Sequence, residues 1–226
     1  MAEGFSERTL KFLVELRIRN DREWYVEHKP DYERYVLRPF QALVAALTPT
    51  MLEIDPMIET TPAVGKTISR IYRDSRFTAD KSLYRDRAWL TFLRKVKDMP
   101  DVPAFYFELT PSGFRYGAGF YGASTKTMEQ YRAFIARDEP GFLKIINAIS
   151  ELNVFDLEGE QYKRNKYAGA SAEIMSWYNR RNIYLAANVS DVTEAFDFDG
   201  LVARLEKGFL ALADIYWFWC KASNIC

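Results

Sequence analysis

The sequence predicts an α+β fold in which a mostly antiparallel central sheet is enclosed by N-terminal and C-terminal helices. Both ends of the chain repeat apolar residues at helical spacing. The middle contains aromatic-rich runs without helix breakers, and a Pro-Ser-Gly turn separates two of them. No linker, repeat or low-complexity tract interrupts the chain. We therefore expect a single domain over residues 1–226.

The N-terminal third is predicted to be helical. Ser6 is a suitable N-cap for a helix that ends near Asn20. A second, short helix should end before Pro30, and the next helix carries a broad apolar face as far as Leu47. Pro39 lies inside that apolar pattern, so we expect a kink or a break there.

The middle of the chain is predicted to form the sheet. Residues 88–93 and 104–109 are strand-like, and residues 114–121 should return as the second strand of a hairpin. Gly117 and Gly119 leave one face of that strand without side chains. Another backbone, an aromatic ring or a ligand must therefore pack closely against this face.

Helices and short strands alternate in the remainder of the chain. We expect helices over 125–137, from Pro140 onward and over 172–179, strand and turn over 155–163, and a strand over 183–189. A long helix over 200–220 should close the chain. Four successive aromatic residues, Tyr216 to Trp219, cannot all face one side of this helix. At least one should be exposed or meet another subunit, which leaves a homodimer open.

Composition narrows the classes of partner and compartment. Lys plus Arg and Asp plus Glu both number 31, so the net charge is zero. This balance disfavours nucleic acid as a partner, although a local basic patch leaves it open. Cys220 and Cys226 form neither a disulfide framework nor a zinc pattern, and we expect no metal and no cofactor. We expect no contact with a membrane and a cytoplasmic location, because no signal-peptide core or membrane-length apolar run is present.

The stretch from Ser69 to Arg85 interleaves charged and aromatic residues more densely than any other part of the sequence. It contains five cations and two anions. Residues 68–72 are predicted to form a short strand, and residues 74–87 a long ordered loop. Such loops are uncommon without their own secondary structure and often carry function.

Two interpretations of this stretch remain open. Guanidinium groups match phosphate and carboxylate oxygens two at a time, which predicts a pocket for an anion: a phosphorylated metabolite or other anionic small molecule, a nucleotide, or a nucleic-acid backbone. Alternatively, arginines and aspartates form an internal network that fixes the loop. The candidate ligand-binding residues are Arg70, Arg73, Asp74, Arg76, Asp80, Lys81, Tyr84, Arg85, Glu108 and Tyr121.

Two further functions are alternatives to binding alone. A hydrolase or transferase acting on a phosphoester or glycoside would use Asp74, Asp80 or Glu108 for acid–base work, with Lys81 or Tyr84 as proton donor. Carboxylates that are exposed and lack an arginine partner would favour this alternative. A structural or interaction protein without a small-molecule site is the other alternative.

Several motifs resemble one known family. They are residues 5–24, Arg70–Phe77 followed by Asp80-Lys81, Phe105–Glu108, Gly117–Tyr121 and Gly159–Arg164. In this order they resemble the domain-of-unknown-function 2461 family of conserved uncharacterised proteins. The chain departs from the family pattern at Leu83 and at Asn165-Lys166, where the family tends to have proline. The resemblance covers essentially the whole chain and implies membership, but no activity, cofactor or catalytic residue.

Overall fold

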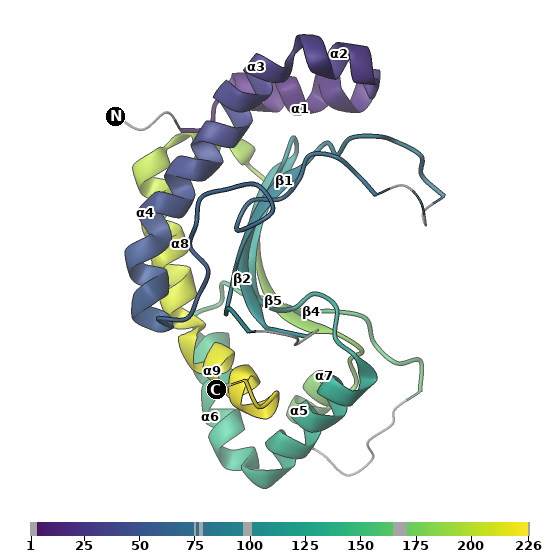
Figure 1. Cartoon of the computed structure of the whole chain (residues 1–226). Coiled ribbons are helices and arrows are strands. Elements are labelled where there is room, and N and C mark those ends of the chain that lie inside the picture. Colours follow the sequence, from purple (N-terminus) through teal and green to yellow (C-terminus); the bar gives the residue numbers. More distant parts are fainter. Residues whose placement is uncertain (1–3, 75, 77–78, 97–100, 165–170, 226) are drawn as a thin grey trace. The chain divides into compact units, whose positions relative to one another are not determined.

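The computed structural model describes residues 4–74, 76, 79–96, 101–164 and 171–225, and it confirms the α+β class (Figure 1). Within these residues one antiparallel sheet has the strand order β1-β2-β3-β5-β4. The strands are β1 (Ala88–Leu93), β2 (Ala104–Thr110), β3 (Gly113–Phe120), β4 (Asp156–Glu158) and β5 (Ile183–Val189). The predicted β2–β3 hairpin is confirmed. Ser75, Phe77, Asn165, Lys166 and Cys226 lie outside the described residues.

The chain divides into two compact units. Unit 1 consists of Met1–Phe92, Tyr106–Tyr116 and Asn188–Lys207. Unit 2 consists of Leu93–Phe105, Gly117–Ala187 and Gly208–Cys226. Strands β1, β2, β3 and β5 therefore contribute residues to both units. The single domain over residues 1–226 stays a prediction.

Unit 1 contains the predicted N-terminal helices. They are α1 (Glu7–Arg19), α2 (Arg22–Glu27), α3 (Lys29–Tyr32), the π-helical turn η1 (Glu33–Leu37) and α4 (Arg38–Ile54). The 3-10 turn η2 (Val192–Phe196) and the start of α8 (Phe198–Ala211) also belong to this unit. Pro39 lies in the first turn of α4, where its missing N–H costs no helical hydrogen bond. The chain is α-helical on both sides of Pro39, so the predicted break does not occur there; the irregularity lies earlier, in the π-helical turn η1.

Aromatic packing fixes which face of the sheet is buried in unit 1. Phe107 on β2 is fully buried, and its ring lies within 6 Å, centroid to centroid, of the rings of Phe5, Phe40 and Phe114. Because alternate strand residues point to opposite faces, Tyr106 and Glu108 lie on the other face. Both are only partly buried.

Residues 69–87, called the arm here, leave the edge of the sheet and return to it. The backbone of the arm pairs at Tyr72 and Tyr84, and the N–H of Arg73 donates to the carbonyl of Leu83 at 2.8 Å. The prediction of a strand over residues 68–72 is wrong. Ile68 pairs with Leu90 on β1, whereas Tyr72 pairs within the arm. Because the segment changes its partner, neither pairing grows into a strand.

Asn20 joins the arm to α1. This residue is the left-handed C-cap of α1, with φ of 42°. Its Oδ1 accepts from the N–H of Leu83 at 2.6 Å and from the N–H of Tyr84 at 3.2 Å, and its Nδ2 donates to the Tyr84 carbonyl at 3.1 Å. The ring of Tyr84 stacks on Tyr25 of α2 at 4.5 Å. The returning half of the arm is therefore tied to the N-terminal helices.

Unit 2 contains helices α5 (Thr125–Arg137), α6 (Glu139–Glu151), α7 (Ala172–Tyr178) and α9 (Ala213–Ala222), and the end of α8. The prediction of one helix over residues 200–220 is wrong, because the helix breaks at Leu212, whose ψ is 2°. Tyr216, Phe218 and Trp219 are buried, whereas Trp217 is only partly buried, 5.6 Å below the Arg94 guanidinium. A homodimer at this cluster stays a prediction.

The close neighbour expected at the two glycines of β3 is the backbone of β5. A Cβ on Gly117 would lie 1.8 Å from the Leu185 carbonyl oxygen. A Cβ on Gly119 would lie 2.4 Å from the Ile183 carbonyl oxygen, and Gly119 has a φ of 153° that other residues rarely adopt.

Among the described residues, no helix is both long enough and apolar enough to cross a membrane.

The replacement Gly119→Val is expected to lower the free energy of unfolding by at least about 3 kcal/mol, because it adds backbone strain and a clash with β5. Gly122→Val is the matched control, since a Cβ at Gly122 meets no atom within 4 Å. This control should change stability by no more than about 0.5 kcal/mol. Urea unfolding measures both, and equal stability of the two variants would remove the packing argument.

Asn20→Ala is expected to destabilise unit 1 by about 2 kcal/mol, through three lost hydrogen bonds and an alanine in the left-handed region. Asn20→Gly keeps the backbone conformation accessible but loses the same three bonds. Hydrogen exchange at the Leu83 and Tyr84 amides should therefore accelerate in both variants. Unchanged exchange in Asn20→Gly would mean that the arm does not depend on this side chain.

Candidate functional site

Nine of the ten candidate residues lie in unit 1. Eight of them, from Arg70 to Arg85, belong to the arm, and Glu108 lies on the partly exposed face of β2. Tyr121 belongs to unit 2, directly after β3, and 85% of its surface is exposed. The structure therefore brings the arm and Glu108 into one unit.

Ion pairs hold the far end of the arm. Asp74 accepts from Arg76 through both oxygens, at 2.9 and 2.7 Å. Asp80 accepts from the hydroxyl and the backbone N–H of Ser82 and from Arg73. The Ser82 hydrogen bonds and the Arg73 charge lower the pKa of Asp80 to about 2. The Arg76 hydrogen bonds likewise lower the pKa of Asp74. Both aspartates are therefore ionised and engaged with arginine, as the network interpretation expects.

Tyr84 belongs to the core of the arm rather than to its surface. Its exposed fraction is only 2%. Burial, with a smaller contribution from Tyr72, raises the pKa of Tyr84 to about 12. The hydroxyl stays protonated at neutral pH and is shielded from solvent, so Tyr84 supports the arm rather than a bound ligand.

Arginines gather where the arm rejoins the sheet. Arg85 donates through Nη1 to the carbonyl oxygens of Arg70, at 2.9 Å, and Tyr72, and its guanidinium lies 5.0 Å above the Trp89 ring. Burial lowers the pKa of Arg85, and the positive charges of Arg73 and Arg87 lower it further. The Arg85 guanidinium is therefore close enough to those of Arg73 and Arg87 to be repelled by each of them.

Glu108 lies between two arginine side chains, those of Arg87 and Arg115. Its Oε1 accepts from Arg115 Nε at 3.0 Å, and its Oε2 lies 3.9 Å from Arg87 Nη1. Four arginines are called the arginine row here: Arg73, Arg85, Arg87 and Arg115. Arg85 is repelled by Arg73 and Arg87, and Glu108 connects Arg87 to Arg115. Only 14% of the Glu108 side chain is exposed. Like Asp74 and Asp80, Glu108 has an arginine partner.

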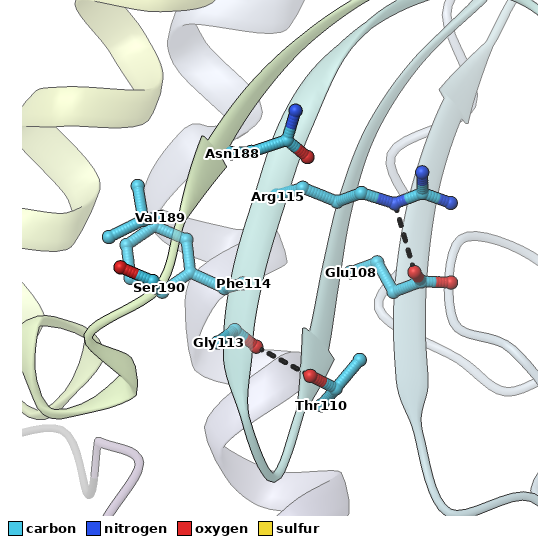
Figure 2. Close-up of a pocket in the computed structure, with 8 residues that line it drawn as sticks. All are labelled: Glu108, Thr110, Gly113, Phe114, Arg115, Asn188, Val189 and Ser190. Atoms are coloured by element: carbon cyan, nitrogen blue, oxygen red, sulfur yellow. Dashed lines mark hydrogen bonds and ion pairs between the residues drawn. The ribbon is translucent and has the colours of Figure 1, made fainter. Parts of the chain in front are cut away.

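A polar hollow of about 280 Å³ adjoins the end of the row in unit 1. Figure 2 shows Arg115 extending from β3 toward Glu108 on β2, with Asn188 of β5 beside them. The lining residues are Glu108, Thr110, Gly113, Phe114, Arg115, Asn188, Val189 and Ser190. Five of the eight lining residues have polar side chains, which can orient a ligand, and Phe114 and Val189 contribute apolar surface.

Sequence reasoning missed the half of this site that lies on or beside the strands: Arg87, Trp89, Tyr106, Arg115 and Asn188. The alternation of Tyr106 and Glu108 with buried Phe107 is a signal that predicts their common face. The pairing of Arg87 with Glu108 had no comparable signal, because it depends on β1 lying beside β2. Within the described part of the chain, no three His, Cys, Asp or Glu side chains come together as a potential metal site.

No curated protein matches the chain significantly. The family model described as conserved hypothetical protein (DUF2461) matches residues 8–218. The matched range contains the arm, the β2–β3 hairpin and the arginine row, and it confirms the resemblance found in the sequence motifs. The chain therefore belongs to the DUF2461 family of conserved hypothetical proteins.

Proposed function

We propose that unit 1 binds an anionic ligand, bearing phosphate or carboxylate groups, along the arm and the arginine row. The gathering of guanidinium groups is the observation that carries this proposal: Arg87 and Arg115 share the Glu108 carboxylate, at 3.9 and 3.0 Å, and the charges of Arg73 and Arg87 act on Arg85. Guanidinium groups held close together raise the energy of the free protein, and a bound anion relieves that repulsion. Forked N–H donors also match the oxygens of phosphate and carboxylate.

The charge balance of the row supports the same conclusion. Arg73 pairs with Asp80, and Arg87 and Arg115 both pair with Glu108, whereas Arg85 donates to backbone carbonyls. Arg70 is exposed and makes no ion pair with a described residue; its guanidinium lies close to Gly65. Counted over residues 69–87 with Glu108 and Arg115, seven Arg and Lys residues stand against four Asp and Glu residues. Positive charge therefore exceeds negative charge at this site.

The other candidate residues have supporting roles in this proposal. Asp74 and Arg76 close the tip of the arm, and Tyr84 fills its core. The part of Tyr121 in ligand binding stays a prediction.

Binding is favoured over hydrolase or transferase chemistry. Each of the three candidate carboxylates, Asp74, Asp80 and Glu108, contacts an arginine. A carboxylate engaged in this way is a weak general base, because its charge is already stabilised.

Inorganic phosphate at low salt is expected to raise the melting temperature. A ligand that binds only the folded state at a hundred times its Kd adds about 2.7 kcal/mol of stability. Arg87→Ala should reduce this shift by more than half while the protein stays folded, because its side chain is 51% exposed and its ion pair with Glu108 is long.

Arg76→Ala is the matched control. It also removes one exposed arginine, but one that pairs with Asp74 at the arm tip. This variant should keep the phosphate shift. A wild-type protein without a shift, or equal losses in Arg76→Ala and Arg87→Ala, would contradict the proposal.

A further inference from the structure

One face of the sheet in unit 1 combines arginines with aromatic rings. Arg87 precedes β1, Glu108 lies on β2 and Arg115 lies on β3, and both arginines contact Glu108. These three side chains are therefore on the same face. Trp89 and Tyr106 are two residues along their strands from Arg87 and Glu108, so they share that face. It is opposite to the face that carries the buried Phe107 ring.

Two arginine–aromatic stacks lie on this face. The Arg85 guanidinium is 5.0 Å from the centre of the Trp89 ring, and the Arg115 guanidinium is 5.9 Å from the centre of the Tyr106 ring. Trp89 and Tyr106 are only partly buried. They belong to β1 and β2, which are neighbours in the sheet, and paired strands are about 4.8 Å apart. Trp89 and Tyr106 thus belong to one face of two neighbouring strands, and each ring has a guanidinium within 6 Å of its centre.

We infer that this face binds single-stranded nucleic acid. The inference rests on the anion binding proposed above and names the class of anion. Unpaired bases stack on aromatic rings and on guanidinium planes, whatever their sequence, while the phosphates contact arginines. In this protein the two arginine–aromatic pairs would contact the bases, and the arginine row would contact the phosphates. The bases of a duplex are already stacked on one another, so the face selects the single strand.

The presence of two arginine–aromatic pairs favours an oligonucleotide over a mononucleotide, because a mononucleotide has one base and can contact only one pair. The net charge of zero does not oppose this inference, since binding depends on the local arginine row. The hollow beside Arg115 adds polar groups from Asn188 and Ser190 where the sugar–phosphate chain would leave the stacks.

The test compares a fluorescein-labelled single-stranded decanucleotide with inorganic polyphosphate of ten residues, by anisotropy and competition at low salt. The decanucleotide should bind about tenfold more tightly than polyphosphate. Tyr106→Leu should weaken oligonucleotide binding about tenfold and leave polyphosphate binding unchanged, because it removes a stacking surface and no charge.

Tyr35→Leu is the matched control. The Tyr35 ring also lies beneath arginine side chains, those of Arg8 and Arg34, but it belongs to η1, and its loss should change neither affinity.

Trp89→Leu removes the other aromatic ring and no charge, so it should reproduce the Tyr106→Leu result and serves if that variant fails to fold. Equal binding of polyphosphate and oligonucleotide, with no effect of Trp89→Leu, would overturn the nucleic-acid inference and leave the anion site standing. Tight duplex binding equal to single-strand binding would overturn it as well. Failure of both ligands to bind would overturn the anion site itself.

Discussion

Unit 1 depends on the burial of Phe107 between the sheet and the N-terminal segment. The rings of Phe5 and Phe40 pack against it, and burying such a side chain contributes about 2 kcal/mol or more. Since strand residues alternate, the same packing directs Tyr106 and Glu108 to the opposite face. A core interaction thereby decides which side chains the candidate site presents. The arm, Arg87 before β1 and Arg115 on β3 contribute further side chains to this same face of the sheet, which core packing determines.

The tip of the arm and the part near the sheet differ in the groups that their arginines contact. At the tip, Asp74 and Asp80 satisfy Arg76 and Arg73, and these pairs confirm that an internal network exists. Where the arm rejoins the sheet, Arg85 is held by backbone carbonyls and an aromatic ring, neither of which carries a negative charge. The two interpretations of the sequence can therefore apply to different parts of the same segment. The network applies to the tip, and the excess positive charge on which the proposed anion site rests lies near the sheet.

Much of the fold was predictable because local patterns determine it. The bounds of β1, β5 and α5 are those that periodicity predicted, and Ser6 and Asn20 delimit α1 as expected. The errors arose where tertiary contacts override local pattern. The break at Leu212 interrupts an otherwise continuous helical period. Ile68 and Tyr72 pair with different partners, which no periodicity within residues 68–72 encodes.

The candidate site was predictable only where charge is dense in the sequence. Arginines of the arm stood out because they are consecutive, whereas Arg87 and Arg115 are far apart in the sequence and meet at Glu108 through strand order. Burial within the charged stretch was not predictable in the same way. Tyr84, a candidate ligand-binding residue of this stretch, is buried and stacks on Tyr25. The family match places the whole arrangement in DUF2461 without assigning an activity to it.

The central claim is that the arginine row has too little negative charge of its own, and Glu108→Gln tests it most directly. Glu108 is the resident anion between Arg87 and Arg115, so it competes with any bound anion. Calorimetric titration with phosphate at low salt should show binding about fivefold tighter in this variant than in the wild type, equivalent to about 1 kcal/mol. Unchanged or weaker phosphate binding in a folded Glu108→Gln protein would contradict the account, and the arginine row would then be part of the structural network.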